Sequence, residues 1–140
     1  MQKVKFYDHV DDTLLKFAVI VCRYNGAWVF CRHKNRTTYE VPGGHREPCE
    51  EIRAAAVREL YEETGAVRFH IRPVCVYSVT EGLHDDSETF GMLYFAEIYG
   101  FQELPDFEME QVVLFPNMPE NLTYPEIQPE LMKKVQEFVK

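Results

Sequence analysis

Three glutamates near the middle of the chain, Glu59, Glu62 and Glu63, have the spacing of a divalent-cation site. If the segment is helical, successive residues are about 100° apart, so the three carboxylates project within an arc of roughly 100°. Near a helix C-terminus, both mutual repulsion and the helix dipole disfavour them. A bound cation would remove both costs, and oxygen ligands favour Mg²⁺ or Mn²⁺ over zinc. The alternative is an ordinary solvated acidic face.

One helix must place these carboxylates on the same side. The pattern of residues 49–64 is helical, and Gly65 suits the left-handed conformation that ends a helix. Ala56, Val57 and Leu60 form an apolar stripe beside the acidic residues, so the helix can pack on a sheet. We therefore expect the carboxylates to lie at the edge of the core rather than in open solvent.

Strand-like runs lie on both sides of this helix. The first two are rich in Val, Ile, Phe and Trp and are joined by Asn25-Gly26, which is typical of a tight hairpin. The two glycines after Pro42 predict a sharply turned loop with free carbonyls. A second helix at the end completes an α/β pattern, with a mixed sheet covered by helices. The expected strands are residues 14–24, 27–34, 67–79, 89–99 and 111–116, with a polar loop at 80–88 and a helix from about Pro129.

The whole chain has the composition of a globular protein. It has 140 residues, 46% of them hydrophobic, so we expect a single domain over residues 1–140. A formal net charge of −8 disfavours binding to a nucleic acid polymer or an anionic membrane. The N-terminal residues lack the apolar segment of a signal peptide, and the longest apolar run, Phe17–Cys22, is too short to span a bilayer. We expect a cytoplasmic protein, with monomer and homodimer both open.

The four cysteines do not have the spacing of a metal site. Cys22, Cys31, Cys49 and Cys75 form no CxxC pair. In the expected hairpin, a two-residue turn would leave the thiols of Cys22 and Cys31 diagonal rather than opposite. We therefore expect buried free thiols.

The acidic cluster belongs to a longer pattern of fixed spacing. Gly44 is followed after five residues by Glu50, and after seven more by RELYEETGA, residues 58–66. This pattern resembles the signature of the Nudix hydrolases, the MutT-like family: G, x5, E, x7, R-E-U-x-E-E-x-G-U, where U is a bulky aliphatic residue. Ala66 departs from it by being small. The VPGG segment, the preceding hairpin and LFPNMPENLTYPE resemble the family less specifically, and the family fold is an α/β/α sandwich.

The resemblance implies a metal-dependent reaction. Nudix hydrolases characteristically cleave a nucleoside diphosphate linked to another group by attack of water on phosphorus. By resemblance, Glu59, Glu62 and Glu63 are the Mg²⁺ ligands, with Mn²⁺ as the alternative ion. The carbonyl of Gly44 is a candidate for a further ligand.

The remaining catalytic roles also follow from the resemblance. Arg58 and Glu50 are expected to form a structural pair, in which the arginine orients the carboxylates. The general base differs among members of the family. It comes from the helix in many of them and from a glutamate on a late loop in others. Glu108 is the candidate here and Glu110 its substitute, with an ordinary polar loop as the alternative.

Four further residues are candidates for substrate binding. Arg32 and Arg36 belong to the densest basic cluster, which leads into the glycine pair and would suit phosphates, although a solvated hairpin end explains it equally well. His45 follows the two glycines and would face the phosphates. Tyr39 would stack on a base, although aromatics at strand spacing are more often core residues.

The leading hypothesis is a Mg²⁺-dependent pyrophosphohydrolase of nucleoside triphosphates, such as an oxidised purine like 8-oxo-dGTP. An ADP-ribose or dinucleoside polyphosphate hydrolase is the alternative within the same class. A prenyl diphosphate isomerase shares the fold, but Cys49 and Cys75 are poorly placed for its cysteine. A non-catalytic nucleotide sensor is a third class, ranked last because the signature glutamates are all present.

Overall fold

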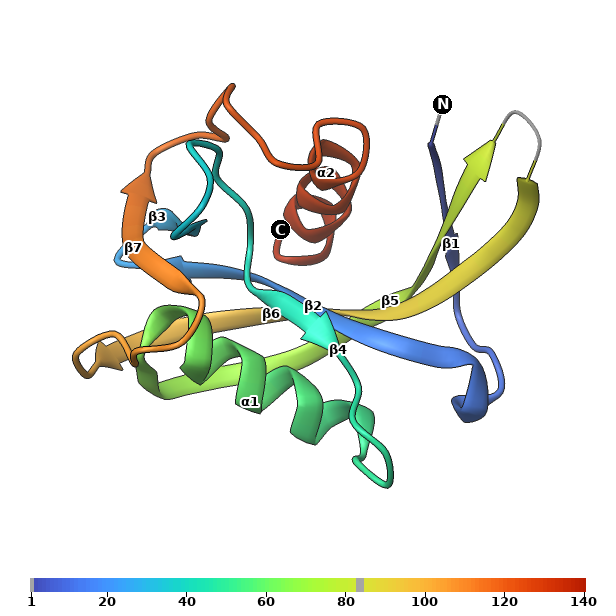
Figure 1. Ribbon diagram of the computed structural model, residues 1–140, viewed down its shortest axis with the longest axis horizontal. Coiled ribbons are helices and arrows are strands. Elements are labelled where there is room, and N and C mark those ends of the chain that lie inside the picture. The colour runs from blue at the N-terminus through green and yellow to red at the C-terminus, as the bar shows by residue number, and fades with distance from the viewer. Residues whose placement is uncertain (1, 83–84) are drawn as a thin grey trace.

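The computed structural model describes residues 2–82 and 85–140, and in it a mixed sheet lies between two helices (Figure 1). Helix α1, Ile52–Thr64, lies on one side of the sheet, and helix α2, Gln128–Phe138, lies on the other. This is the α/β/α sandwich expected from the sequence. None of the helices in these ranges is long and apolar enough to cross a membrane.

Within the described ranges the sheet has seven strands. They are β1 Lys3–Tyr7, β2 Leu15–Tyr24, β3 Ala27–His33, β4 Gly43–His45, β5 Ala66–Gly82, β6 Asp85–Phe101 and β7 Met109–Phe115, and a 3₁₀ turn, η1 Asp12–Leu14, precedes β2. The order is β1-β5-β6-β2-β3-β7, and β4 pairs with β2 beside this path. Strands β2 and β6 are parallel and the other pairs are antiparallel, so the sheet is mixed as predicted.

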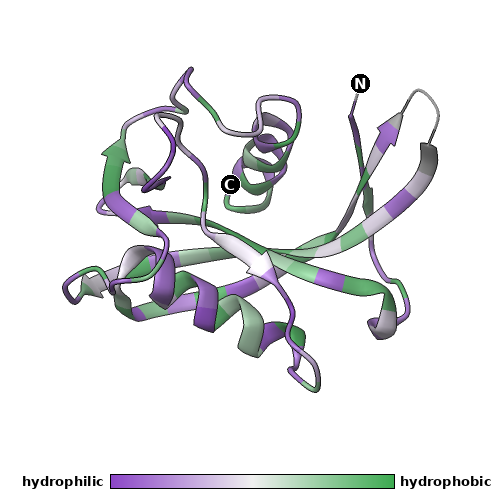
Figure 2. Cartoon of the chain, viewed as in Figure 1, coloured by the Kyte–Doolittle hydropathy of each residue, from purple (hydrophilic) through white to green (hydrophobic). Residues whose placement is uncertain are grey.

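Each helix packs on the sheet through its own hydrophobic cluster. On the α1 side, Ala56 and Leu60 are fully buried and Val57 packs against them, as the apolar stripe predicted. On the α2 side, Leu131 and Val135 pack on the opposite face of the sheet. Both helices combine hydrophobic and hydrophilic residues (Figure 2), as one buried face requires. Each large side chain buried in this way stabilises the fold by about 1.5–3 kcal/mol.

The first hairpin has the predicted two-residue turn. Asn25 and Gly26 have φ of 49° and 83°, and Cys22 pairs with Val29 across the strands. Positive φ at both central residues matches the twist of the flanking strands, which explains the Asn-Gly sequence. The cysteines are free, as expected, but the thiol of Cys49 is exposed while the other three are buried.

Helix α1 ends where the sequence predicts. Gly65 has φ of 77°, and its N–H donates to the Tyr61 carbonyl at 2.8 Å, which closes the last turn. A Cβ at Gly65 would lie 2.6 Å from the Gln102 carbonyl oxygen, so close packing also requires glycine here.

The predicted start of this helix was wrong, because α1 begins at Ile52 rather than near Cys49. A turn occupies the segment before it. Pro48 and Cys49 are its central residues, and the N–H of Glu50 donates to the Glu47 carbonyl at 3.1 Å. Cys49 has φ of 64°, which a right-handed helix does not allow.

The glycine pair is a strand rather than the expected sharply turned loop. Strand β4 pairs antiparallel with β2, and Gly44 lies opposite Ala18 in this pairing. A Cβ at Gly43 would lie 2.8 Å from the Ala18 carbonyl oxygen, so glycine permits a close approach here rather than a turn.

The ends of the sheet also differ from the prediction. Strand β1, which was not expected, pairs with β5 and forms one edge. Strand β5 continues to Gly82 and β6 begins at Asp85, so much of the loop expected at residues 80–88 is strand, while residues 83–84 lie outside the described part. Pairing between neighbouring strands satisfies the backbone here regardless of the polar side chains.

Candidate active site

A cavity of about 540 Å³ lies beside β4, between the end of α1 and the start of α2. Glu63, Gly43 and Gly44 line one part of it, and apolar side chains of β2, β5 and α2 line another. The cavity therefore joins the end of the acidic helix to an apolar pocket on the α2 side of the sheet. The wall thus combines apolar side chains with many polar and charged ones, and such a concave mixed surface can hold a small polar molecule.

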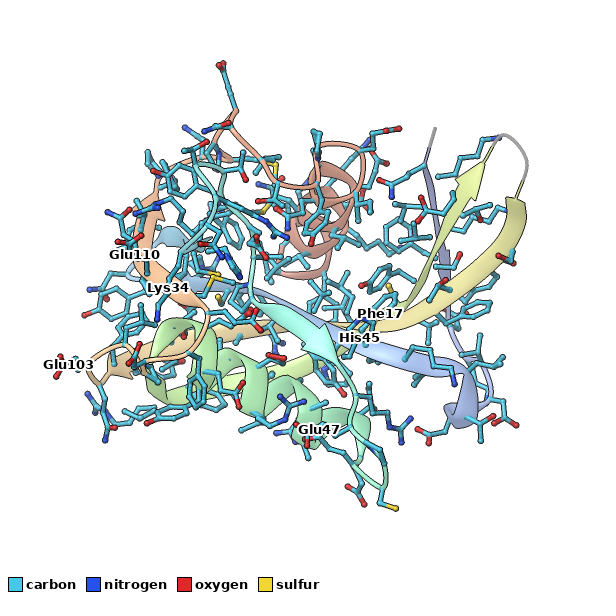
Figure 3. The ribbon with its side chains drawn as sticks, in the orientation of Figure 1. Phe17, Lys34, His45, Glu47, Glu103 and Glu110 are labelled. Carbon is cyan, nitrogen blue, oxygen red and sulfur yellow. The ribbon has the colours of Figure 1, made fainter. Side chains whose placement is uncertain are left out.

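Aromatic rings form part of the apolar wall. The rings of Phe17 and Tyr77 are tilted against each other, with centroids 5.7 Å apart. Gly91 makes room for both, because a Cβ there would collide with each ring. Figure 3 shows His45 next to Phe17, and the two rings meet edge to face at 5.9 Å. These residues give the cavity a surface suited to a flat aromatic group.

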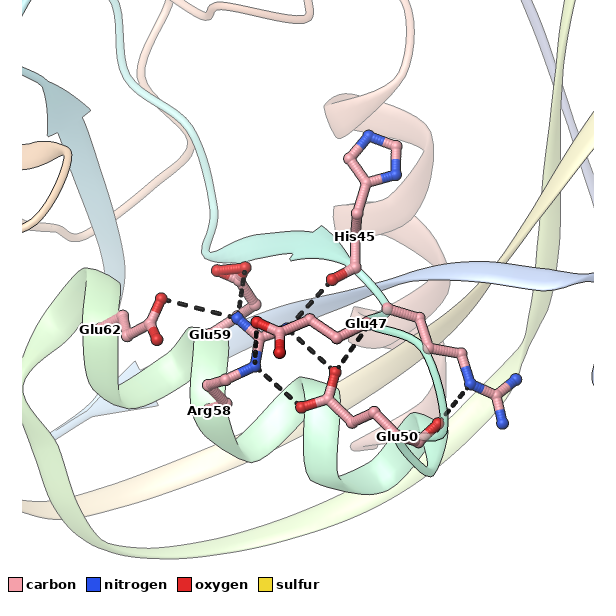
Figure 4. Close-up of polar contacts among 7 residues, drawn as sticks. His45, Glu47, Glu50, Arg58, Glu59 and Glu62 are labelled. Carbon is pink, nitrogen blue, oxygen red and sulfur yellow. Dashed lines mark hydrogen bonds and ion pairs between the residues drawn. The ribbon is translucent and has the colours of Figure 1, made fainter.

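Arg58 neutralises much of the acidic cluster (Figure 4). Its guanidinium donates to both carboxylate oxygens of Glu50, at 2.8 and 3.0 Å. The same group lies 3.4 Å from Glu59 and 3.6 Å from both Glu47 and Glu62. The crowding of carboxylates is therefore offset in part by one arginine within the helix itself, before any cation is considered.

The Arg58–Glu50 pair also joins α1 to the segment before it. Hydrogen bonds from Arg58, together with the Glu47 N–H, lower the pKa of Glu50 to about 2. Arg58 further donates to the His45 carbonyl at 3.0 Å, at the end of β4. The arginine thus holds both the glycine strand and the turn that precedes the helix.

Two carboxylates of the cluster are buried with less compensation. Burial raises the pKa of Glu63 to about 9, although its carboxylate accepts the Gly43 N–H at 2.8 Å. Burial also raises the pKa of Glu59 to about 7, against the opposing effect of Arg58. Both groups therefore favour a nearby positive charge.

Gly44 lies directly against the Glu59 carboxylate. A Cβ at this position would collide with it, so the glycine gives the carboxylate its place beside the strand. The Gly44 backbone takes part in the pairing with β2, so its carbonyl is not the free group that a loop would provide. A carbonyl has two lone pairs, and one remains for a cation.

The donor chemistry of this region fits a hard divalent cation, although the side chains do not converge on one. Glu59, Glu62 and Glu63 offer oxygen ligands, two of them buried with raised pKa values. Among the described residues, however, no three acidic, His or Cys side chains form a metal-ligand cluster. Glu62 turns to Arg58 and Glu63 to the Gly43 N–H. The metal assignment of these three glutamates stays a prediction.

The two candidate bases are placed differently. A bulge interrupts the β3–β7 pairing between Arg32 and His33. Glu108 lines the cavity, 3.6 Å from the His33 ring, and its carbonyl accepts the Lys34 N–H at 2.9 Å. Glu110 instead forms an ion pair with Arg32 at 3.3 Å and is not among the residues that line the cavity. In Figure 3, Glu110 lies along β7 at the side of the molecule.

The substrate-binding candidates divide in the same way. Arg36 and His45 line the cavity. Arg32 and Tyr39 do not, because Arg32 bonds to Gln111 and the Arg36 carbonyl, and the Tyr39 ring packs on an aromatic of β7. Arg32 is therefore better interpreted as part of a solvated hairpin end, and Tyr39 as an aromatic residue of the core.

Sequence reasoning missed several polar residues of the cavity, among them Glu40 and Gln128. Glu40 is buried and receives a hydrogen bond of 3.0 Å from Arg36, and their i,i+4 spacing was the signal that could have found it. Gln128 is also buried in the cavity wall, but a glutamine before Pro129 carries no such signal.

The α/β/α sandwich with an acidic helix at its edge is the fold expected of a Nudix domain. The family model described as NUDIX domain matches residues 13–134, so the chain belongs to the Nudix family and is a hydrolase of that family. Nudix hydrolases generally use divalent metal ions.

Known relatives share both sequence and fold. YtkD of Bacillus subtilis (strain 168), provisionally named an 8-oxo-dGTP diphosphatase, is 38% identical over 109 residues, which are 77% of this chain and 66% of that protein. The crystal structure of a mutant of the Bacillus subtilis pyrophosphohydrolase BsRppH is 31% identical, with a TM-score of 0.79 over 98% of this chain and 90% of that chain. A MutT NUDIX hydrolase from Burkholderia pseudomallei, at 18% identity and a TM-score of 0.66 over 85% and 95%, shares the fold.

Proposed function

We propose that this Nudix hydrolase is a cytoplasmic enzyme that converts a nucleoside triphosphate and water to a nucleoside monophosphate and pyrophosphate. Oxidised purines such as 8-oxo-dGTP are the leading substrates. The observation that carries this proposal is the cavity that joins Glu63 and the glycine strand to the apolar wall of Phe17 and Tyr77. The similarity to YtkD and to BsRppH supports the same class of reaction.

In this proposal Glu59, Glu62 and Glu63 would hold the cation, with the Gly44 carbonyl as a further ligand. Mg²⁺ bound there would neutralise the diphosphate and lower the pKa of an attacking water. Arg58 orients Glu59 and Glu62 through contacts of 3.4 and 3.6 Å.

The remaining polar residues of the cavity receive the substrate and its proton. Glu108 takes the proton from the attacking water as general base, which requires the carboxylate to be ionised and within one hydrogen bond of that water. Arg36 neutralises phosphate charge from the cavity wall, where Glu40 fixes its guanidinium at 3.0 Å. His45 extends the same wall at the end of β4.

The alternative substrates are ADP-ribose and dinucleoside polyphosphates, which contain the same kind of anhydride bond. An isomerase is less consistent with the site. Cys75 is buried in the cluster under α2, Cys49 is exposed on the turn before α1, and neither is among the residues that line the cavity. A cysteine for alkene chemistry is therefore not available there.

The experiment that tests this function is a substrate panel with product identification. Nucleoside triphosphates, 8-oxo-dGTP, ADP-ribose, a dinucleoside tetraphosphate and isopentenyl diphosphate are incubated with Mg²⁺ and, separately, with EDTA. We expect Mg²⁺-dependent release of pyrophosphate and monophosphate from the triphosphates. Isomerised prenyl diphosphate, or tight nucleotide binding without turnover, would overturn the proposal.

A further inference from the structure

The imidazole of His33 lies between a backbone N–H and the carboxylate of Glu108. His33 is the last residue of β3, and it lines the same cavity as Glu108. Its Nδ1 accepts the N–H of Asn35 at 3.1 Å, and its Nε2 lies 3.6 Å from Oε2 of Glu108. One ring nitrogen is therefore engaged by the backbone, and the other is turned to the carboxylate proposed above as general base.

The contact with Asn35 assigns the position of the ring proton. A neutral imidazole has one N–H donor and one acceptor nitrogen. Because Nδ1 accepts the Asn35 N–H, the proton of the neutral ring lies on Nε2. The same hydrogen bond fixes the orientation of the ring, so His33 presents a donor to Glu108 from a defined position.

Glu108 needs a partner of this kind because its side chain extends into solvent. The side chain of Glu108 is 74% exposed, whereas that of His33 is 21% exposed. An exposed glutamate samples several rotamers, and holding it in one of them costs conformational entropy. A separation of 3.6 Å is longer than a hydrogen bond, but a small rotation of the exposed side chain closes it. Catalytic contacts are often this long before the substrate binds.

The bulge between β3 and β7 creates this pairing. Up to Arg32 the two strands follow one register, which would set His33 opposite Glu110 if it continued. The bulge instead sets His33 opposite Met109, the residue directly after Glu108. The irregularity of the sheet therefore decides which glutamate of the segment meets the imidazole.

The residue after His33 holds the two segments together. The N–H of Lys34 donates to the Glu108 carbonyl at 2.9 Å, and its Nζ donates to Oδ1 of Asp106 at 2.7 Å. These contacts connect the end of β3 to the segment that leads into β7. The backbones of His33 and Glu108 therefore keep a fixed relation to each other.

We propose that His33 is a positioning residue that orients Glu108 for abstraction of a proton from the attacking water. This inference rests on the proposed function, in which Glu108 is the general base. The Nε2–H of His33 donates to one oxygen of the carboxylate and leaves the other oxygen free to accept from the water. His33 does not take the proton itself, because Nε2 already carries one and Nδ1 is engaged by Asn35.

Two substitutions of His33 separate this role from a purely structural one. In His33→Gln, the amide nitrogen reaches about as far as Nε2, so the donor to Glu108 is kept and the contact with Asn35 is lost. In His33→Asn, the shorter amide accepts the Asn35 N–H in place of Nδ1 but cannot reach Glu108. His70→Asn is the control, because His70 is exposed on β5 and is not among the residues that line the cavity.

Steady-state kinetics with 8-oxo-dGTP and Mg²⁺ measure the effect of each change. We expect His33→Asn to lower kcat by about tenfold or more and to leave KM within about twofold of the wild type. His33→Gln should keep kcat within about threefold, and His70→Asn should match the wild type. In a Glu108→Gln background, His33→Asn should cost less than about twofold further, because no base remains to be oriented.

A measurement of the ring tautomer tests the geometry without any substrate. The imidazole nitrogen resonances of isotope-labelled protein, recorded at about pH 8 where an ordinary imidazole is neutral, should show the Nε2–H form of His33. A proton on Nδ1 would overturn the inference. This measurement uses the wild type, so it decides the question even where His33→Asn does not fold.

The kinetics overturn the inference in three cases. In the first, His33→Gln loses as much kcat as His33→Asn or more, which is the pattern of a structural contact with Asn35. In the second, neither variant loses kcat. In the third, the loss from His33→Asn persists in full in the Glu108→Gln background. A wild type that hydrolyses no triphosphate would refute the proposed function instead, so the two failures are distinguishable.

Discussion

The Glu63 carboxylate accepts a hydrogen bond of 2.8 Å from the backbone N–H of Gly43, which joins the last turn of α1 to strand β4. A carboxylate in this position is buried and lies near Glu59, Glu40 and Glu108, and its pKa is raised to about 9. Its charge is therefore unfavourable to the fold unless a cation is bound nearby.

This relationship predicts how stability depends on pH. The folded-state pKa of Glu63, about 9, lies above its ordinary value of 4.5, so the folded protein binds the extra proton between these pH values. Its contribution to the free energy of unfolding is fully present below about pH 4.5 and is lost as the pH rises toward 9. Without divalent cations, Glu63→Gln should stabilise the protein by roughly 1–3 kcal/mol at pH 7. It should also make the free energy of unfolding depend less steeply on pH.

Urea unfolding in EDTA between pH 5 and pH 9 measures this difference. Glu103→Gln is the matched control, because Glu103 is exposed on the loop after β6. Mg²⁺ should raise the stability of the wild type more than that of Glu63→Gln. If the free energy of unfolding changed with pH equally in all three proteins, Glu63 would be ionised at no cost to the fold.

Gly44 and Glu59 give a second prediction. A Cβ at Gly44 would collide with the carboxylate, which is the flexible end of a side chain and can move away. Gly44→Ala should therefore lower kcat/KM by about tenfold or more with a small change in Tm. In a Glu59→Ala background, the added alanine should cost little further activity. Additive losses in kcat/KM would mean that the glycine acts independently of Glu59.

Local patterns predicted much of this site, because its helix is coded by neighbouring residues. The acidic face, the apolar stripe through Leu60 and the cap at Gly65 all depend on spacings within α1. The hairpin at Asn25-Gly26 depends on the backbone preferences of two residues.

The rest of the site depends on pairing between distant segments, which the sequence does not display. The glycine pair became β4 because β2 lies beside it, and the Gly43 N–H then faces Glu63. The bulge in β3–β7 separates the environments of Glu108 and Glu110, although both belong to the same acidic segment. The position of Gln128 in the cavity wall likewise follows from the fold, because its local sequence does not indicate it.

Arg58 gives a third prediction, because lysine cannot reproduce its paired hydrogen bonds to Glu50 at 2.8 and 3.0 Å. Arg58→Lys should lower the free energy of unfolding at pH 7 by about 1–2 kcal/mol. The depressed pKa of Glu50, about 2, means that this contribution is present above about pH 4.5 and is lost as the pH falls toward 2. The deficit of the variant should therefore shrink in acid.

Urea titrations at pH 7 and pH 3 measure this deficit for Arg58→Lys. Arg53→Lys on the same helix is the control, since Arg53 makes one long contact of 3.4 Å to the Ile71 carbonyl and should tolerate the change at both pH values. A deficit of the same size at pH 3 as at pH 7 would show that the Glu50 pairing is not its source.

Glu108 and Glu110 are two glutamates of the same segment in different environments, so Glu110 serves as the control for Glu108 in the last prediction. Glu108 lines the cavity beside His33, whereas Glu110 pairs with Arg32 outside it. If Glu108 is the general base, Glu108→Gln should lower kcat by roughly 10²- to 10⁴-fold with little change in KM, and it should remove the acidic limb of the kcat profile, because that limb reports protonation of the base. Glu110→Gln should stay within about twofold of the wild type, since it loses a single exposed ion pair. Steady-state kinetics from pH 5 to pH 10 decide between the two. A retained acidic limb in Glu108→Gln would move the role of base to the glutamates of α1.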